Sequence, residues 1–502
     1  MRRQHDTSCP ACRANRAGER VTSFVRMPDR PSPEASDADR AAIEGGVVAA
    51  GLAAPRDPLT AEEIKGRAAG GAVTLGARSL VIFGLGVVGN LVLARLLVPR
   101  DLGLVALGTT LITVARYISD AGVAVALIGR TETPSREELG AVQGFQLATT
   151  TALAVCFAAA ASPFGRDGLV PALMITSLPL ASLRMPTVLM LERQLNYGVI
   201  ARADVVEAVV GYTWAIATVA VGWGVWGLAS AAPIRVLAGS ATVMRLGPVG
   251  LVRPRWDWHL VRPILGFGVR FQAINAVSAG RDQGLNAGIA AIAGVPTLGL
   301  WSLAWRIMQV PFLLFVTLWR VSYPAMSRLL ETRHDPRPVI ERAIGVVAVA
   351  LSPIVVGIAA GAHALLPPLV GNRWAPSADI LVFSSAAMMI SAPVSITSVG
   401  YLLASRQPTK ILISAVAQAV TWLGVALSLL SPLGVTAIGL GWLAMSLVDL
   451  TLLSRWVGRD TGARIMRSLM GPAAVAVLAG GLGLIVASAG HHRVLTGLLG
   501  VF

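Results

Sequence analysis

Residues 90–114, NLVLARLLVPRDLGLVALGTTLITV, align without a gap on residues 286–310, NAGIAAIAGVPTLGLWSLAWRIMQV, when the sequence is shifted by 196 positions. Identical residues meet at seven of the 25 positions, although apolar composition by itself raises such counts. Six predicted membrane spans separate the copies, so both copies have the same orientation. Two parallel halves that face each other across a central cavity are typical of membrane transporters. The identical residues are Asn90, Ala94, Leu102, Gly103, Leu104, Leu107 and Val114.

The composition around this repeat is that of a protein embedded in a lipid bilayer. Of the 502 residues, 54% are hydrophobic and 14% are charged, and the mean hydropathy is +0.67. Aromatic residues make up 6%, and no alternating ten-residue pattern occurs, which favours helices over barrel strands. We therefore predict an all-α polytopic integral membrane protein with about 13 (12 to 14) transmembrane helices. The predicted spans are 73–97, 102–129, 139–162, 169–192, 204–222, 227–244, 263–292, 298–327, 343–365, 379–404, 411–430, 435–454 and 469–489.

Hydropathy divides the chain into four regions. Residues 1–70 contain many acidic residues and prolines but no apolar pattern, so we predict a disordered cytoplasmic tail. Residues 71–250 form an N-lobe with spans 1 to 6, and residues 251–460 form a C-lobe with spans 7 to 12. Residues 461–502 add one or more further spans. No basic segment followed by an apolar core occurs at the start, so no cleavable signal peptide is expected.

The distribution of basic residues predicts the orientation of the chain. The loops that follow even-numbered spans hold 18 lysines and arginines, whereas those that follow odd-numbered spans hold four. Basic loops stay on the cytoplasmic side of a membrane. We therefore expect the N-terminus and the even-numbered loops to lie in the cytoplasm, and the protein to lie in the cell membrane. Most of the net charge of +15 is then explained by topology, and no nucleic-acid role is needed.

Four segments resemble a known transporter family. They are ARLLVPRDLGLVALGTTLITVARYISDAGVAVALIGR (94–130), PTVLMLERQLNYGVIARADVVEAVVG (186–211), GWGVWGLA (222–229) and GLWSLAWRIMQVPFLLFVTLWRVSYPAMSRL (299–329). These segments are similar to those of Wzx-type bacterial polysaccharide flippases. That polysaccharide transporter family belongs to the superfamily that also contains multidrug and toxin extrusion antiporters and the lipid II flippase. The resemblance covers residues 72–455.

The resemblance implies two six-helix lobes that work by alternating access. It also implies that an undecaprenyl-diphosphate-linked oligosaccharide passes from the cytoplasmic to the outer leaflet. Members of this family usually have twelve or fourteen spans, so a thirteenth span would be a departure. A polysaccharide polymerase and glycosyltransferases are possible partners on this interpretation.

Polar residues inside the spans indicate where a substrate would bind. Nine arginines lie within the spans, and the deep carboxylates are fewer, chiefly Asp120 and Asp282. A charge that faces lipid at mid-bilayer costs about 3 kcal/mol or more, so we expect these groups to face a cavity or a partner helix. Guanidinium groups bind phosphate oxygens in a bidentate manner, which favours an anionic cargo. The candidate substrate-binding residues are Arg270, Arg281, Arg116, Arg306, Asn275 and Asn286.

Structural explanations for the same residues stay open. Arg281 and Asp282 could form a buried pair between spans, or Asp282 could neutralise Arg306. Arg116 and Asp120 are four residues apart and could pair on one helix, with ISDAG (118–122) as a helix break. As buried carboxylates, Asp282 and Asp120 are also the candidates for coupling to an ion such as H+ or Na+. Three arginines nearer the span ends, Arg78, Arg95 and Arg320, are expected to extend towards lipid headgroups.

Catalysis has little support in the sequence. No Walker A loop occurs, the six histidines lie far from any second ligand or nucleophile, and we expect no metal and no cofactor. One CxxC pair, Cys9 and Cys12, is at most half of a zinc site. A membrane polymerase or ligase would be expected to carry a large outer loop, and the longest predicted here is LPPLVGNRWAPSA (366–378). The alternatives to a polysaccharide flippase are a multidrug-type or other lipid transporter and, with less support, such an enzyme.

Overall fold

The computed structural model describes residues 61–120, 122–128, 133–250, 252–332, 334–472, 474–475 and 478. Across this part of the chain the regular secondary structure is helical, and no strand occurs. The described helices all belong to one compact unit, residues 51–502. Within them, ten helices are long and apolar enough to cross a membrane, or 11 when a bent pair is included. The prediction of an all-α polytopic membrane protein is confirmed.

The helices of the N-terminal half follow the predicted spans closely. Their bounds are α2 Ala61–Leu96, α3 Pro99–Asp120, α4 Val123–Ile128, α5 Arg136–Ala161, η1 Ser162–Phe164, α6 Arg166–Ile175, α7 Ser177–Ser182, α8 Met185–Arg193, α9 Tyr197–Thr218, η2 Val219–Trp223 and α10 Val225–Leu246. Two predicted spans differ from the structure. The second stops at Asp120, as ISDAG predicted, and α4 is a separate short helix. The fourth is bent by 51° where α7 gives way to α8.

The C-terminal half is built from longer helices. Their bounds are α11 Trp258–Glu331, α12 Arg337–Val370, η3 Asn372–Trp374, α13 Ser377–Ala404, α14 Pro408–Leu433 and α15 Thr436–Thr461. The thirteenth predicted span, 469–489, extends beyond the described residues, as does most of the predicted N-terminal tail. The exact number of spans therefore stays a prediction.

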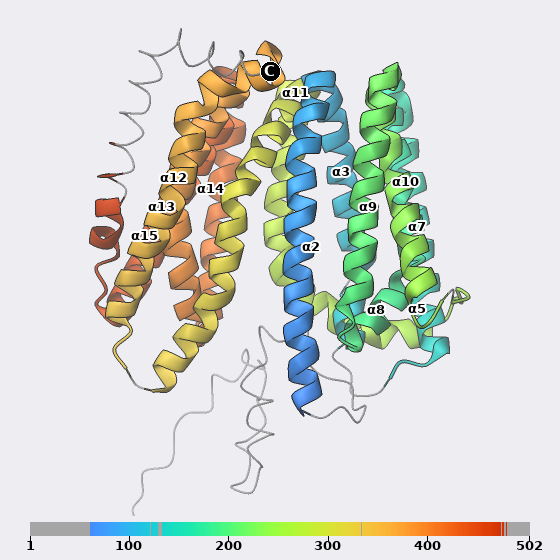
Figure 1. Cartoon of the computed structure of the whole chain (residues 1–502), viewed down its shortest axis with the longest axis horizontal. Helices are drawn as coiled ribbons and strands as arrows, with labels where there is room; N and C mark the ends of the chain where they lie inside the picture. Colours follow the sequence, from blue (N-terminus) through green and yellow to red (C-terminus); the bar gives the residue numbers. More distant parts are fainter. Residues whose placement is uncertain are drawn as a thin grey trace, which may run out of the picture. The chain divides into compact units, whose positions relative to one another are not determined.

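Helix α11 is a hairpin of two spans. Gly294 has φ 82° and ψ 167°, a conformation that glycine adopts freely and that breaks the helix. The indole Nε1 of Trp301 donates to Asn286 Oδ1 at 3.0 Å. Fifteen residues of straight helix would separate these groups by about 22 Å, so the chain must reverse between them. The two halves match the predicted spans 263–292 and 298–327, and Figure 1 shows α11 rising to one end of the unit and returning.

The internal repeat appears as a reciprocal contact between α3 and the α11 turn. A Cβ added to Gly103 would overlap the carbonyl oxygen of Val295, and one added to Gly299 would overlap that of Pro99. A shift of 196 residues converts Gly103 into Gly299 and Pro99 into Val295. The two contacts are therefore equivalent, as expected where two copies of a motif meet about a pseudo-twofold axis. Only glycine allows the backbones to approach this closely.

The helices before residue 250 gather on one side of α11, and α12 to α15 gather on the other (Figure 1). Helices α2, α3 and α11 lie where the two groups meet. The division into an N-lobe of residues 71–250 and a C-lobe of residues 251–460 remains our interpretation of this arrangement. The largest apolar core joins residues of α2 and α3 to residues of α11 through α15.

Candidate functional site

A polar cavity of about 240 Å³ lies between α3, the two halves of α11 and α14. Three of the candidate residues line it: Asp282, Asn286 and Arg306. They meet because the α11 hairpin folds the helix that carries Asp282 and Asn286 back against the helix that carries Arg306. Further lining residues are Thr109, Thr110 and Thr113 of α3 together with Trp301, Trp305 and Trp422.

Two hydrogen bonds in this region are related by the 196-residue repeat. Asn286 Nδ2 donates to Thr110 Oγ1 at 3.1 Å, and Arg306 Nη1 donates to Asn90 Oδ1. Positions 90 and 286 are equivalent in the repeat, and so are positions 110 and 306. The two copies thus build the same contact, but one uses an arginine where the other uses a threonine. Arg306 is half-buried and has no carboxylate within ion-pair distance among the described residues.

Three tryptophans line one side of the cavity, and a fourth, Trp442, packs behind them. Trp301 and Trp305 come from α11, Trp422 from α14 and Trp442 from α15. Their ring centroids lie between 5.3 and 6.0 Å apart. Aromatic rings at this spacing pack in preferred edge-to-face and tilted arrangements, which makes the wall stiff. Such a wall presents flat apolar faces beside the polar groups of the cavity.

Arg281 is not among the residues that line the cavity, and its side chain contacts α14. Its Nε lies 2.8 Å from Asp282 Oδ1, and its Nη1 donates to Gln418 Oε1 at 3.5 Å. Its guanidinium also lies 5.5 Å from the centroid of Trp422. Arg281 and Asp282 thus pair with each other, which was one of the two explanations left open. Asp282 does not neutralise Arg306, whose hydrogen-bond partner is Asn90.

The structure contains a buried carboxylate that the sequence reasoning missed. Asp449 on α15 is 4% exposed and accepts hydrogen bonds from Ser395 Oγ, Ser414 Oγ at 2.6 Å and Gln418 Nε2 at 2.9 Å. Because Gln418 also accepts from Arg281, the network joins α11, α13, α14 and α15. The signal was present in the sequence as a single acid in an otherwise apolar span, which is where polar residues are expected to have a partner or a function.

Arg116 and Asp120 are not among the residues that line the cavity. Arg116 is exposed near the end of α3, and Asp120, which is half-buried, is the last residue of that helix. The side chains of Arg270 and Asn275 lie outside the part of α11 for which side chains are described. The structure therefore places three of the predicted residues around one cavity and leaves the functional roles of all of them as proposals.

Arg78 and Arg95 of α2 contact groups on neighbouring helices, whereas we expected their side chains to extend towards headgroups. Arg78 Nη2 lies 2.7 Å from Asp204 Oδ2 of α9. Arg95 Nε donates to the carbonyl oxygen of Leu369 at 2.5 Å, near the end of α12. Both side chains find acceptors on neighbouring helices, and such contacts are preferable to the loss of hydrogen bonds in an apolar setting.

Contacts at the end of α2 join it to the segment after α12. The indole Nε1 of Trp374 donates to the carbonyl oxygen of Ala94 at 2.9 Å, and Trp374 is fully buried. Arg373 Nη2 donates to the carbonyl oxygen of Arg95. These bonds occupy carbonyl groups that have no partner within the helix because they lie in its last turn. The end of α2 is thereby fastened to the C-terminal half.

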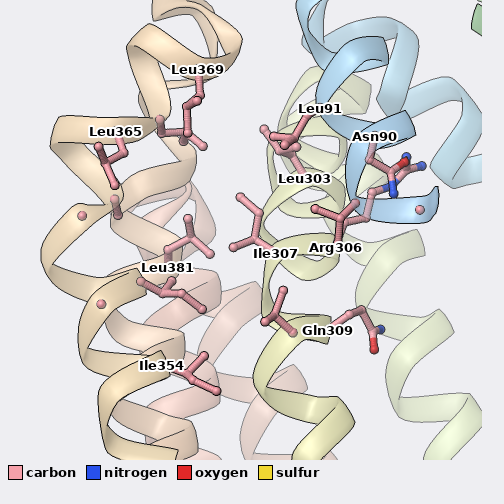
Figure 2. A pocket seen from close by; sticks show the side chains of 18 of the residues that line it. Asn90, Leu91, Leu303, Arg306, Ile307, Gln309, Ile354, Leu365, Leu369 and Leu381 are labelled. Carbon is pink, nitrogen blue, oxygen red and sulfur yellow. The ribbon is translucent and has the colours of Figure 1, made fainter. Parts of the chain in front are cut away.

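A second, larger cavity of about 620 Å³ opens beside Arg306, between α2, the second half of α11 and α12 (Figure 2). Its walls are aliphatic: Leu365, Leu369 and Ile354 face Leu303 and Ile307 across the gap in Figure 2. Arg306 and Asn90 mark its border, and Arg306 lines both this cavity and the polar one.

The two cavities together suit an amphiphilic anion. Among the described residues, no group of three or more His, Cys, Asp or Glu side chains could hold a metal ion. The polar cavity offers a guanidinium, amides and hydroxyls, which donate hydrogen bonds to an anion. The adjoining cavity offers only aliphatic contact over most of its surface.

Comparisons with known proteins agree with this architecture. The sequence model of a family described as "Polysaccharide biosynthesis protein" matches residues 92–379. The lipopolysaccharide biosynthesis protein WzxC of Escherichia coli (strain K12) is 25% identical over 312 residues, which are 59% of this chain and 62% of WzxC. The match therefore spans less than two thirds of that relative.

Solved structures share the fold at low sequence identity. The lipid II flippase MurJ in its inward closed conformation has a TM-score of 0.60 and 11% identity, and the match covers 84% of this chain and 99% of MurJ. A multidrug resistance MATE family transporter of the MOP superfamily, in its inward-facing conformation, has a TM-score of 0.54 and 15% identity. That match covers 78% of this chain and 98% of the transporter.

Proposed function

Since the chain belongs to the polysaccharide biosynthesis protein family, whose sequence model spans more than half of it, we propose that it is a flippase for undecaprenyl-diphosphate-linked oligosaccharides. It moves these units across the cytoplasmic membrane by alternating access, for the assembly of a cell-surface polysaccharide. The single observation that carries the proposal is Arg306, a cation on the border between a polar and an aliphatic cavity.

The charge of the cavity supports an anionic cargo. Asp282 is paired with Arg281, so the positive charge of Arg306 is not offset by an ion pair among the described residues. A guanidinium can bind a diphosphate through two parallel hydrogen bonds. Asn286 and the α3 threonines add neutral groups for the first sugars or the phosphates, and the tryptophan wall offers faces against which sugar rings can pack. A cation-selective drug transporter would need the opposite charge.

The other candidate residues take supporting roles in this proposal. Arg281 neutralises Asp282, and Arg116 with Asp120 lies at the end of α3 that joins the basic loops. Arg270 and Asn275 precede this region on α11 and would meet the substrate as it enters. The N-terminus and the basic loops lie in the cytoplasm, and the two lobes rock about the α3 and α11 contact. An ion such as H+ or Na+ resets the carrier, with Asp282 and Asp120 as its candidate carriers.

A cell-based experiment separates this proposal from the alternatives. Cells that lack the protein should accumulate the lipid-linked oligosaccharide on the cytoplasmic leaflet and lose the exported polysaccharide, and expression of the full chain should restore both. If the lipid-linked unit still reached the outer leaflet and only polymer length changed, the protein would be a polymerase or ligase. If the cells lost resistance to cationic dyes while export was normal, it would be a multidrug transporter.

A further inference from the structure

The aliphatic cavity has the form of a groove that is open along its side. Val87 on α2 and Leu365 and Leu369 on α12 are 37%, 53% and 45% exposed, although they lie within membrane spans. Gly357 and Gly361 also line the groove and remove side chains from the α12 wall. Its volume of about 620 Å³ is in the range of ligand-binding cavities.

The polar cavity and the apolar groove adjoin each other, as the polar head and the apolar tail of one amphiphile require. Arg306 contributes to the lining of both, so a phosphate held by its guanidinium would lie at the entrance of the groove. Leucines, isoleucines and valines dominate the groove lining, and branched aliphatic side chains are matched in shape by branched isoprene units. An ordinary charged or sugar-bearing group would lose its hydrogen bonds in the groove.

The internal repeat provides two equivalent positions for a charged anchor, and only one of them carries an arginine. The partner of Arg306 in the other copy is Thr110, which carries no charge, while Asn90 and Asn286 are the same in both copies. A headgroup anchored by charge is therefore drawn to the gap between α2 and the second half of α11. The equivalent gap between the first half of α11 and α3 has no such anchor at the corresponding position.

From these observations we propose that the groove between α2, the second half of α11 and α12 binds the first isoprene units of the substrate's polyprenyl chain. Arg306 holds the diphosphate at the head of the groove, and the rest of the chain passes between Val87 and Leu365 into the bilayer. This inference rests on the proposed function, because it assigns a place to the lipid part of the proposed substrate.

A bulky residue in the groove tests the inference against a matched control on the same helix. Gly357 and Gly345 both lie on α12, and a Cβ added at either has no atom within 4 Å, but only Gly357 lines the groove. Wild-type protein, Gly357→Phe and Gly345→Phe are reconstituted into proteoliposomes. Translocation is measured for an undecaprenyl-diphosphate-linked oligosaccharide and for a methyl-diphosphate analogue with the same glycan, which has no isoprene unit to enter the groove.

Gly357→Phe should lower the translocation rate of the undecaprenyl-linked substrate by about tenfold, because extra atoms in an occupied apolar site weaken binding by about that factor. The rate for the methyl-diphosphate analogue should change by less than about twofold, as for substitutions away from an occupied site. Gly345→Phe should match wild-type protein on both substrates. An equal fall on both substrates, or no fall on either, would overturn the inference. If wild-type protein moved neither substrate, the proposed function itself would fail.

Photocrosslinking gives an independent readout on protein that keeps Gly357. Benzoylphenylalanine replaces Leu365 in the groove or Val349, which is on α12 outside it and 61% exposed. In a large excess of phosphatidylethanolamine, radiolabelled undecaprenyl-diphosphate oligosaccharide should label the protein far more strongly from the Leu365 position than from the Val349 position. Equal labelling at the two positions would show that the groove holds ordinary bilayer lipid.

Discussion

At the scale of single residues, Arg306 is the side chain on which the proposed function depends most. Its guanidinium donates to Asn90 Oδ1 and lines both cavities. We expect Arg306→Gln to lower export by about 10- to 100-fold, the loss of one to two charge-assisted hydrogen bonds. Arg306→Lys should be intermediate, because lysine keeps the charge but loses the bidentate geometry. The measurement is polysaccharide export per molecule of membrane-inserted protein.

A matched arginine variant controls for general effects of lost charge. Arg100 pairs with Asp167 on an exposed face, with Nη2 to Oδ2 at 2.5 Å and a side chain that is 59% exposed. Arg100→Gln should leave export and folding nearly unchanged, since exposed ion pairs contribute little. Normal export by a correctly folded Arg306→Gln protein would remove Arg306 from the substrate path.

Asp449 should matter for stability, because its carboxylate accepts hydrogen bonds from three donors on two neighbouring helices, α13 and α14. Asp449→Ala leaves buried donors unpaired, each at a cost of about 1–3 kcal/mol, and should lower the thermal midpoint clearly. Ser446→Ala on the same helix is the control, because Ser446 Oγ is buried without a hydrogen-bond partner among the described residues. Thermal unfolding followed by size-exclusion fluorescence compares them. Equal midpoints for the two variants would contradict the structural importance of the network.

Single residues also show what sequence alone could and could not predict. The sequence located Asp282, Asn286 and Arg306 inside spans, since charge in an apolar run is visible without a structure. Which of them pair was not visible, because pairing depends on how helices pack. Arg281 and Asp282 are about 100° apart on a helical wheel, yet the long arginine side chain bends to reach the carboxylate at 2.8 Å. Arg78 likewise finds Asp204 across a helix interface.

At the scale of elements, most helices were predictable because membrane spans need about 20 apolar residues in a row. The repeat also predicted that spans 2 and 8 are equivalent, and their reciprocal glycine contacts agree with that. The bend of 51° before α8 was not predicted, since hydropathy reports the length of an apolar run and not its straightness. The contacts of α2 with Arg373 and Trp374 could not be predicted either, because they join segments about 280 residues apart in the sequence.

The close approach of α3 and the α11 turn predicts that a larger residue at Gly299 will disturb the packing of these helices. Gly299→Val would place a side chain on the Pro99 carbonyl and should force the helices apart at this end. We expect export to fall at least tenfold, because overpacking at this contact costs about 1–3 kcal/mol or more in the stability of the packed helices. Gly284→Val on the first half of α11 is the control, because its Cβ would meet Leu423 at an ordinary 3.8 Å. Equal export by the two variants would count against a mechanical role for the α3 and α11 contact.

At the scale of the whole molecule, the charge distribution predicts which end faces the cytoplasm. With Cys9, Cys12 and Cys156 replaced by serine, a single cysteine at Pro254 should resist a membrane-impermeant thiol reagent in intact cells. A cysteine at Asn372, at the opposite end, should react. Both positions are exposed, so access to the reagent decides the result. Labelling at Pro254 but not at Asn372 would mean that the orientation is inverted.

The central claim concerns the cargo, and the most direct measurement is translocation in proteoliposomes that contain only the full chain. An undecaprenyl-diphosphate-linked oligosaccharide is placed in both leaflets, and a glycan-cleaving enzyme outside reports how fast the inner pool becomes accessible. We predict that wild-type protein makes the whole pool accessible under an imposed H+ or Na+ gradient, while Arg306→Gln leaves the inner pool largely protected. If the inner pool stayed protected with folded wild-type protein under every gradient, or if a cationic dye crossed in its place, the account would be contradicted.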